Sequence, residues 1–139
     1  GKMSKSENQN ATLYLSDEDE LIRKKVMKAK TDSGPSLPGS PKPDYIENIF
    51  GLMKLVSEPG TVAKFEADYN NCSIRYGDMK KQLGEDMVKF ISPIREKATA
   101  IRNDSGYLRG VMEKGAEKAR KSAKSTMELV RQAVGLNYF

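Results

Sequence analysis

The chain has 139 residues, of which 31% are charged and 37% hydrophobic, and its net charge of +5 permits partners that carry phosphates. This length suits one compact domain, and no stretch approaches the roughly 20 apolar residues of a membrane span. A single cysteine, Cys72, excludes an internal disulfide and favours a reducing, cytoplasmic location. The chain has no histidine, which excludes serine–histidine and cysteine–histidine catalysis and imidazole-based zinc sites, so we expect no metal site.

Helical periodicity dominates the chain, and no alternating pattern typical of strands competes with it. The first ten residues are polar and are expected to form a loop. A helix is predicted over 17–30, with Ser16 as its N-cap and Asp19 in the capping-box position. Acidic residues at its start and basic residues after them complement the helix dipole. Its buried stripe should consist of Ile22, Val26 and Ala29.

The middle of the chain alternates between a proline-rich connection and amphipathic helices. Four of the six prolines fall within 31–43, where no regular structure is expected. Asp44 should cap a helix that ends at Glu58-Pro59-Gly60, and a shorter helix should begin at Thr61. The inward-facing residues of these two helices are predicted to be Ile46, Ile49, Phe50, Met53 and Val56, then Val62, Phe65 and Tyr69.

The C-terminal half reads as a long helix followed by two shorter ones. From Asp78 the apolar residues recur in steps of three and four, at Met79, Leu83, Met87, Phe90, Ile94, Ala98 and Ile101. Pro93 lies inside this pattern and should kink the helix without ending it. A short helix should end near Gly115 and a last one should end at Gly135, a left-handed C-cap. The sequence therefore predicts an all-α fold, an irregular bundle of about five helices.

The most distinctive chemistry lies in residues 2–6. Two ammonium groups and two hydroxyls on one short polar segment can wrap a polyphosphate, because lysines supply charge and serines supply short-range hydrogen bonds. If these contacts form as phosphate charge builds up, they stabilise the transition state more than the ground state. On composition alone, a disordered basic tail is the alternative. The residues concerned are Lys2, Met3, Ser4, Lys5 and Ser6.

These five residues match, letter for letter, the KMSKS signature of class I aminoacyl-tRNA synthetases. Further segments resemble bacterial tryptophanyl-tRNA synthetases in the same order along the chain. They are Thr31-Asp32-Ser33-Gly34-Pro35, Tyr76-Gly77-Asp78-Met79-Lys80-Lys81, Gly115-Ala116-Glu117-Lys118-Ala119 and Val134-Gly135-Leu136. The resemblance covers essentially the whole chain.

The resemblance implies a parent enzyme that activates tryptophan with ATP and Mg²⁺, releases pyrophosphate, and then charges tRNA(Trp). It implies that Lys2 and Lys5 act in catalysis by contacting the ATP phosphates and the leaving pyrophosphate, and that residues 2–6 form the nucleotide-contacting loop. It divides the chain into a signature loop with its connection, 1–15, and a helical, anticodon-binding domain, 16–139.

The same resemblance implies an RNA-contacting group at the start of the long helix. Lys80 aligns with a family position that approaches the anticodon. Its neighbours Lys81, Arg75 and Tyr76 are expected to join it, with Tyr76 or an arginine stacking on unpaired bases.

One departure from the family pattern shapes the expectation. Class I enzymes carry a nucleotide-binding fold with a histidine-containing motif before the signature, and this sequence has neither. We therefore expect a C-terminal fragment, inactive in aminoacylation alone and holding no cofactor by itself, whose parent is a homodimer. Two alternatives stay open, a stand-alone helical module that binds protein, with an incidental signature match, and a stand-alone RNA-binding protein.

Overall fold

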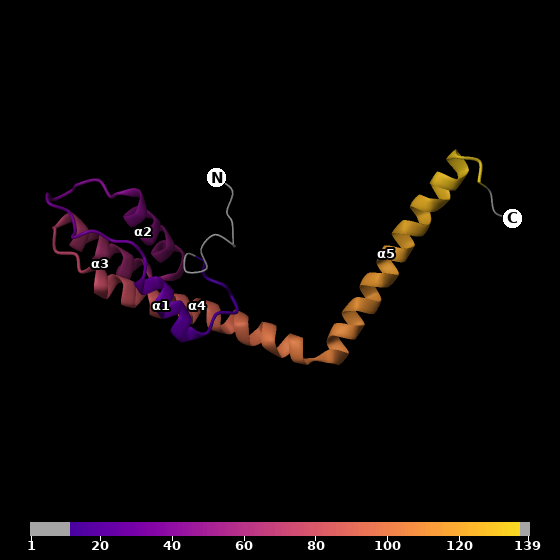
Figure 1. Cartoon of the computed structure of the whole chain (residues 1–139), viewed down its shortest axis with the longest axis horizontal. Coiled ribbons are helices and arrows are strands. Elements are labelled where there is room, and N and C mark those ends of the chain that lie inside the picture. Colours follow the sequence, from indigo (N-terminus) through magenta and orange to yellow (C-terminus); the bar gives the residue numbers. More distant parts are fainter. Residues whose placement is uncertain (1–11, 137–139) are drawn as a thin grey trace. The chain divides into compact units, whose positions relative to one another are not determined.

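The computed structural model describes residues 12–136. This range contains five helices and no strand, which confirms the all-α prediction (Figure 1). The helices are α1 (Asp19–Met27), α2 (Asp44–Val56), α3 (Pro59–Asn70), α4 (Tyr76–Asn103) and α5 (Ser105–Ala133). None of these five helices combines the length and apolar character needed to cross a bilayer. The chain forms two compact units, the N-terminal unit (residues 1–96) and the C-terminal unit (residues 97–139).

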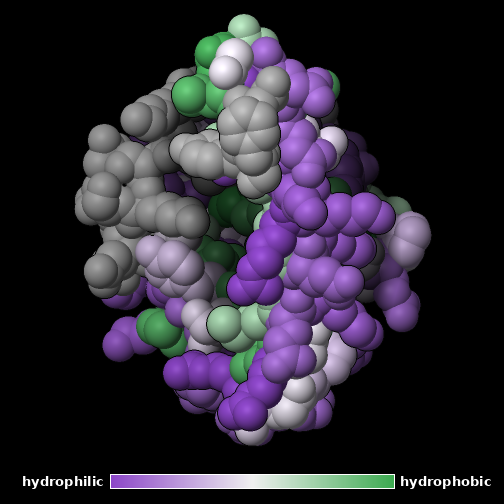
Figure 2. All heavy atoms as spheres, turned by 90° about the vertical axis from the view of Figure 1, so that its right-hand side faces the viewer, coloured by the Kyte–Doolittle hydropathy of each residue, from purple (hydrophilic) through white to green (hydrophobic). Residues whose placement is uncertain are grey.

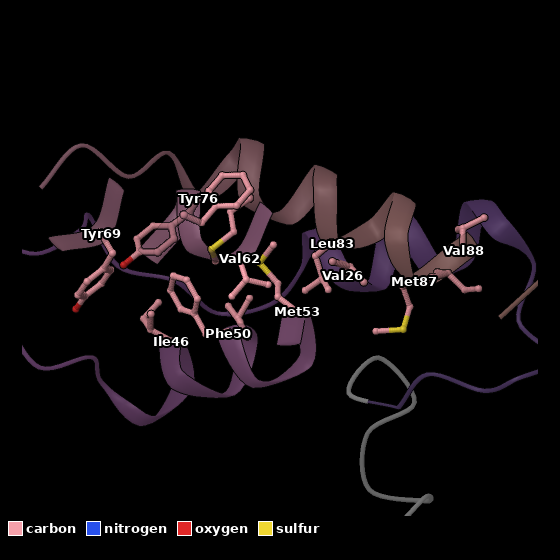
Figure 3. Close-up of a cluster of buried hydrophobic side chains, with 14 of the residues drawn as sticks. Val26, Ile46, Phe50, Met53, Val62, Tyr69, Tyr76, Leu83, Met87 and Val88 are labelled. Atoms are coloured by element: carbon pink, nitrogen blue, oxygen red, sulfur yellow. The ribbon is translucent and has the colours of Figure 1, made fainter. Parts of the chain in front are cut away.

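The core of the N-terminal unit draws on all of its helices. Fully buried side chains come from α1 (Ile22), α2 (Phe50), α3 (Tyr69) and α4 (Met79), and they pack in one cluster. Figure 3 shows this cluster, with Phe50 and Tyr69 among the labelled residues. The Phe50 and Tyr69 rings meet edge to face, with centroids 6.2 Å apart. The predicted stripes of α2 and α3 are confirmed, because their inward residues are buried or packed against the core. The hydrophobic effect therefore joins four successive helices in one core.

The buried side of α4 differs from the predicted stripe in its second half. The buried residues follow steps of four through Met79, Leu83, Met87 and Ile91. Phe90, which the pattern placed inside, is 52% exposed. The periodicity alone could not separate these two faces, since steps of three and of four are both helical. The helix continues past Pro93 without a break, as predicted.

Helix starts are the least accurately predicted features. The N-cap of α1 is Glu18 rather than Ser16, and no side chain caps it. Asp44 is the first residue of α2 instead of its cap, and α3 begins at Pro59 rather than Thr61. Proline suits this first helical position because its missing N–H is one that a helix start leaves unpaired.

The proline-rich connection of residues 31–43 is held by specific contacts. The Tyr69 hydroxyl donates to the carbonyl of Pro41 at 3.3 Å, and the Gly39 amide donates to the carbonyl of Asn70 at 3.2 Å. The Lys42 ammonium lies 4.9 Å from the centroid of the Phe50 ring, which adds a cation–π contact. The connection is therefore irregular in backbone but anchored to α2 and α3.

After the end of α4, the C-terminal unit contains one long helix where two were predicted. α5 passes through Gly115 without interruption and has no buried residue. Its N-cap Asp104 accepts a hydrogen bond from the Tyr107 amide at 2.8 Å. At its other end Gly135 has φ +74°, and the Leu136 amide donates to the carbonyl of Arg131 at 2.9 Å. The left-handed C-cap predicted at Gly135 is therefore confirmed, and the bond from Leu136 to Arg131 makes it a Schellman motif.

The packing of the core predicts that two residues of α2 contribute very differently to the free energy of unfolding. Phe50→Ala should lower the free energy of unfolding of the N-terminal unit by about 3–5 kcal/mol, because it removes a fully buried ring and leaves a cavity. Leu55→Ala, at a side chain that is 76% exposed, should change it by about 0.5 kcal/mol or less. Urea unfolding of both variants measures the difference, and equal losses would contradict the assigned core.

Candidate phosphate- and RNA-contacting residues

Residues 2–6, the predicted phosphate-contacting segment, lie outside the described residues. Their expected contacts with ATP, including those of Lys2 and Lys5, stay a prediction. The described chain begins at Thr12, and residues 12–17, here called the entry segment, connect the signature to α1.

A buried lysine holds the entry segment. The Lys25 ammonium donates to the carbonyl oxygen of Thr12 at 2.8 Å and to Asp17 Oδ2 at 2.6 Å. It also lies 4.9 Å from the centroid of the Tyr14 ring. The side chains of Lys25 and Asp17 are only 8% and 9% exposed. One side chain of α1 therefore contacts three residues of the entry segment.

Asp17 closes the same arrangement from within the segment. Its Oδ2 accepts a hydrogen bond from the Tyr14 amide at 3.0 Å, and its own amide donates to the carbonyl of Tyr14 at 3.0 Å. Burial by itself would raise the pKa of Asp17, but the hydrogen bonds from Lys25 and from the Tyr14 amide outweigh it and lower the pKa below its ordinary value. The carboxylate is therefore held in its charged form.

Two arginines fasten α1 to α4. The Arg23 guanidinium donates two hydrogen bonds to Glu85, from Nε to Oε1 at 2.8 Å and from Nη2 to Oε2 at 3.0 Å. Arg95 donates to the backbone carbonyl of Asp17 and to the carboxylate of Asp19. The hydrogen bond to the Asp19 carboxylate lowers the pKa of Asp19. A planar guanidinium suits such paired contacts. The entry segment and α1 are thus joined to α4, and the predicted RNA-contacting group lies at the start of this helix.

The structure gives Lys80 a role inside the fold. Its ammonium donates to the carbonyl of Ala29 at 3.1 Å and to Thr31 Oγ1 at 3.3 Å. Both acceptors lie just after α1, where the chain enters the connection of residues 31–43. The predicted contact of Lys80 with the anticodon stays a prediction, but the side chain already has these two partners.

Tyr76 lies in the core rather than on the surface. Only 8% of the residue is exposed, and its ring packs among the buried side chains of α2 and α3 (Figure 3). Burial, reinforced by the nearby Asp32 carboxylate, raises the pKa of Tyr76 well above its ordinary value. Asp32 itself accepts hydrogen bonds from the Gly34 amide at 2.8 Å and the Tyr45 hydroxyl at 3.0 Å. Little of Tyr76 is open to solvent, and its expected stacking on an unpaired base stays a prediction.

Arg75 and Lys81 are the exposed members of the predicted group. Arg75 precedes α4, and Lys81 lies in its second turn. In the C-terminal unit, α5 carries further exposed basic residues, Arg109, Lys114, Lys118, Arg120, Lys121, Lys124 and Arg131. The face shown in Figure 2 is mainly hydrophilic, with smaller hydrophobic patches. Exposed cations of this kind can contact phosphates because they are accessible from solvent.

A family model described as tRNA synthetases class I (W and Y) matches residues 1–92 of the chain. The chain belongs to this synthetase family. The tryptophan–tRNA ligase of Porphyromonas gingivalis is 50% identical over 135 residues, which make up 97% of this chain and 41% of that protein. Tryptophan–tRNA ligase 1 of Streptomyces coelicolor and the tryptophan–tRNA ligase of Rhodopirellula baltica are 35% and 34% identical, each over 97% of this chain. The chain spans about two fifths of the length of these curated relatives.

Membership in the family favours a signature that is part of the synthetase over an incidental match, since the matched region contains residues 2–6. The ion pairs described above therefore belong to a protein of the synthetase family. Sequence reasoning missed Lys25 as an organising residue because it treated the charges of α1 as complements of the helix dipole. It missed Arg95 of α4 because no local pattern encodes contacts with Asp17 and Asp19, which lie 78 and 76 positions earlier in the chain. The sequence held only a weak signal for the ion pair of Lys25 with Asp17, because Lys25 lies about two helical turns after Asp17, which precedes α1.

The lowered pKa of Asp17 predicts a pH dependence of stability. A depressed carboxyl pKa contributes stability above the pKa of the unfolded state, about 3.9, and this stability is lost as the pH falls through the folded-state pKa. Asp17→Asn should therefore lower the free energy of unfolding by about 1.5–3 kcal/mol near pH 7, and by progressively less below about pH 4.

Thermal or urea unfolding between pH 2 and pH 7 measures this dependence. Asp44→Asn, at the exposed first residue of α2, serves as the control for loss of one negative charge. A difference between the chain and Asp17→Asn that stays constant over this range would contradict the assigned charge pairing.

Proposed function

We propose that the chain is the part of a tryptophan–tRNA ligase that carries the KMSKS signature and the helical region after it. The observation that supports this most directly is the 50% identity to the Porphyromonas gingivalis ligase over 97% of the chain. The complete enzyme would activate tryptophan with ATP, release pyrophosphate and transfer the tryptophanyl group to tRNA(Trp). The remaining three fifths of the family's length would supply the nucleotide-binding fold, as the resemblance implies.

In this proposal Lys2 and Lys5 act on the leaving group of the first step. A carboxylate oxygen of tryptophan attacks the α-phosphorus of ATP, and the bond from that phosphorus to the bridging oxygen of pyrophosphate breaks. Negative charge builds up on the pyrophosphate as it leaves. Two ammonium groups placed against it stabilise the transition state more than bound ATP, and this raises the rate. Ser4 and Ser6 would add hydrogen bonds to the same oxygens.

The helical region is proposed to contact the tRNA through its exposed cations. Arg75 and Lys81 at the start of α4 are the best placed of the expected group, because Lys80 is engaged with Ala29 and Thr31 and Tyr76 is buried. Phosphate contacts of this kind position the RNA, and an arginine plane can stack on an unpaired base. The basic residues of α5 would extend the contact along the RNA backbone.

The leaving-group role predicts a specific loss of activity. In the complete synthetase containing this chain, Lys5→Ala should slow tryptophan-dependent ATP–pyrophosphate exchange by about 10²–10³-fold, the cost of removing one transition-state contact. Lys2→Ala should slow it to a smaller extent. Lys64→Ala, at an exposed lysine of α3, is the control. Full exchange activity in both signature variants would overturn the proposal.

The RNA-contacting role predicts a loss confined to the second step. Lys81→Glu should lower kcat/KM for tRNA charging by about tenfold and reduce the salt dependence of tRNA binding, while leaving pyrophosphate exchange unchanged. Lys89→Glu makes the same charge change at an exposed site two turns further along α4 and should have little effect on either step. If the two variants lower tRNA charging equally, Lys81 makes no particular contact and only net charge matters.

A further inference from the structure

Lys80 of α4 is bonded to the two residues on either side of Lys30. Its ammonium donates to the carbonyl of Ala29 at 3.1 Å and to Thr31 Oγ1 at 3.3 Å, and these acceptors lie 51 and 49 positions earlier in the chain. A cation near the end of α1 can satisfy a carbonyl that the helix leaves unpaired. That accounts for the bond to Ala29, but not for the second bond to a hydroxyl beyond Lys30.

The side chain of Lys30 is held as well. Its ammonium lies 4.9 Å from the centroid of the Tyr45 ring, and the Tyr45 hydroxyl donates to Asp32 Oδ2 at 3.0 Å, which fixes the ring. Lys30 is nevertheless exposed. Its backbone is thus held through Lys80 and its side chain through Tyr45, while its charge stays accessible. A side chain that is ordered in advance loses less entropy when it contacts a ligand.

The segment that carries Lys30 also packs beside Arg75. A Cβ atom placed on Gly34 would lie 3.7 Å from Cγ2 of Ile74, the residue before Arg75. Together with the bonds of Lys80, this contact holds the segment against the start of α4, where RNA contacts are proposed. An additional cation in this region suits the polyanionic backbone of a tRNA.

We propose that Lys30 contacts a phosphate of the tRNA and that Lys80 is the positioning residue that holds Lys30 in place. The proposal rests on the function proposed above, and it gives Lys80 an indirect part in RNA binding. An ammonium binds a phosphate as a point charge, so the place at which it is held decides the contact. The Asp32 carboxylate opposes a phosphate nearby, but it already accepts hydrogen bonds from the Gly34 amide and the Tyr45 hydroxyl, which offset part of its charge.

The test uses the complete synthetase containing this chain. Lys30→Met should lower kcat/KM for tRNA charging about five- to tenfold and reduce the salt dependence of tRNA binding by about one phosphate contact, while pyrophosphate exchange stays unchanged. Lys64→Met is the matched control, because Lys64 is also an exposed lysine beside a ring, with its ammonium 5.7 Å from the Phe65 centroid. Charging by Lys30→Met that equals charging by this control would contradict the proposed contact.

Two further variants test whether Lys80 acts through Lys30. Lys80→Met should lower tRNA charging by a factor similar to that of Lys30→Met. Thr31→Val removes one acceptor without changing any charge and should lower charging about two- to fivefold. In a chain that already carries Lys30→Met, neither change should lower charging further by more than about 1.5-fold. A direct RNA contact of Lys80, or a general structural role, would instead multiply the losses and refute the positioning role.

The remaining outcomes are also decisive. If Lys80→Met does not fold, Thr31→Val alone decides the positioning role by the same criterion. If Lys81→Glu also leaves tRNA charging unchanged, the RNA-contacting function proposed for the start of α4 fails and the role of Lys30 falls with it. If Lys81→Glu lowers charging and Lys30→Met does not, only the contact of Lys30 is wrong.

Discussion

A buried ion pair between Lys25 and Asp17 is the constraint on which the N-terminal part of the structure depends. It forces the chain before α1 to turn back along that helix, because the ammonium must satisfy both the Thr12 carbonyl and the Asp17 carboxylate. The Lys25 side chain is only 8% exposed, so its ammonium pays a large desolvation cost unless its hydrogen-bond partners are kept. The path of the entry segment therefore follows from the need to keep this pair complete.

Apolar and charged contacts also join α1 to the rest of the N-terminal unit. Apolar stripes on four helices form one core, and charged pairs at its edge set the register of α1 on α4. The family match over residues 1–92 covers almost the whole of this unit, whereas the curated relatives also extend over α5. In the proposed enzyme the N-terminal unit would thus connect the catalytic signature directly to the exposed cations of α4.

The sequence could predict most of the fold but less of the site. Helical stripes such as that of α2 were readable because burial imposes a period of 3.6 residues. The ends of helices were not, since Glu18 and Pro43 occupy cap positions without any side-chain cap. For Lys80, charge suggested the surface, but its partners lie about 50 positions earlier in the chain, and no local pattern encodes such a contact. The KMSKS segment, by contrast, could be recognised as a motif from the sequence, but it lies outside the described residues.

Native-state hydrogen exchange of the chain tests most directly whether the ion pair fixes the entry segment. The Tyr14 amide bonds to the Asp17 carboxylate and the Asp17 amide to the Tyr14 carbonyl, so both should exchange on the timescale of the helical amide of Val26. Lys25→Met should release the first two amides selectively. Exchange of Tyr14 and Asp17 at the rate of an unstructured peptide, with Val26 still protected in the unchanged chain, would contradict the account.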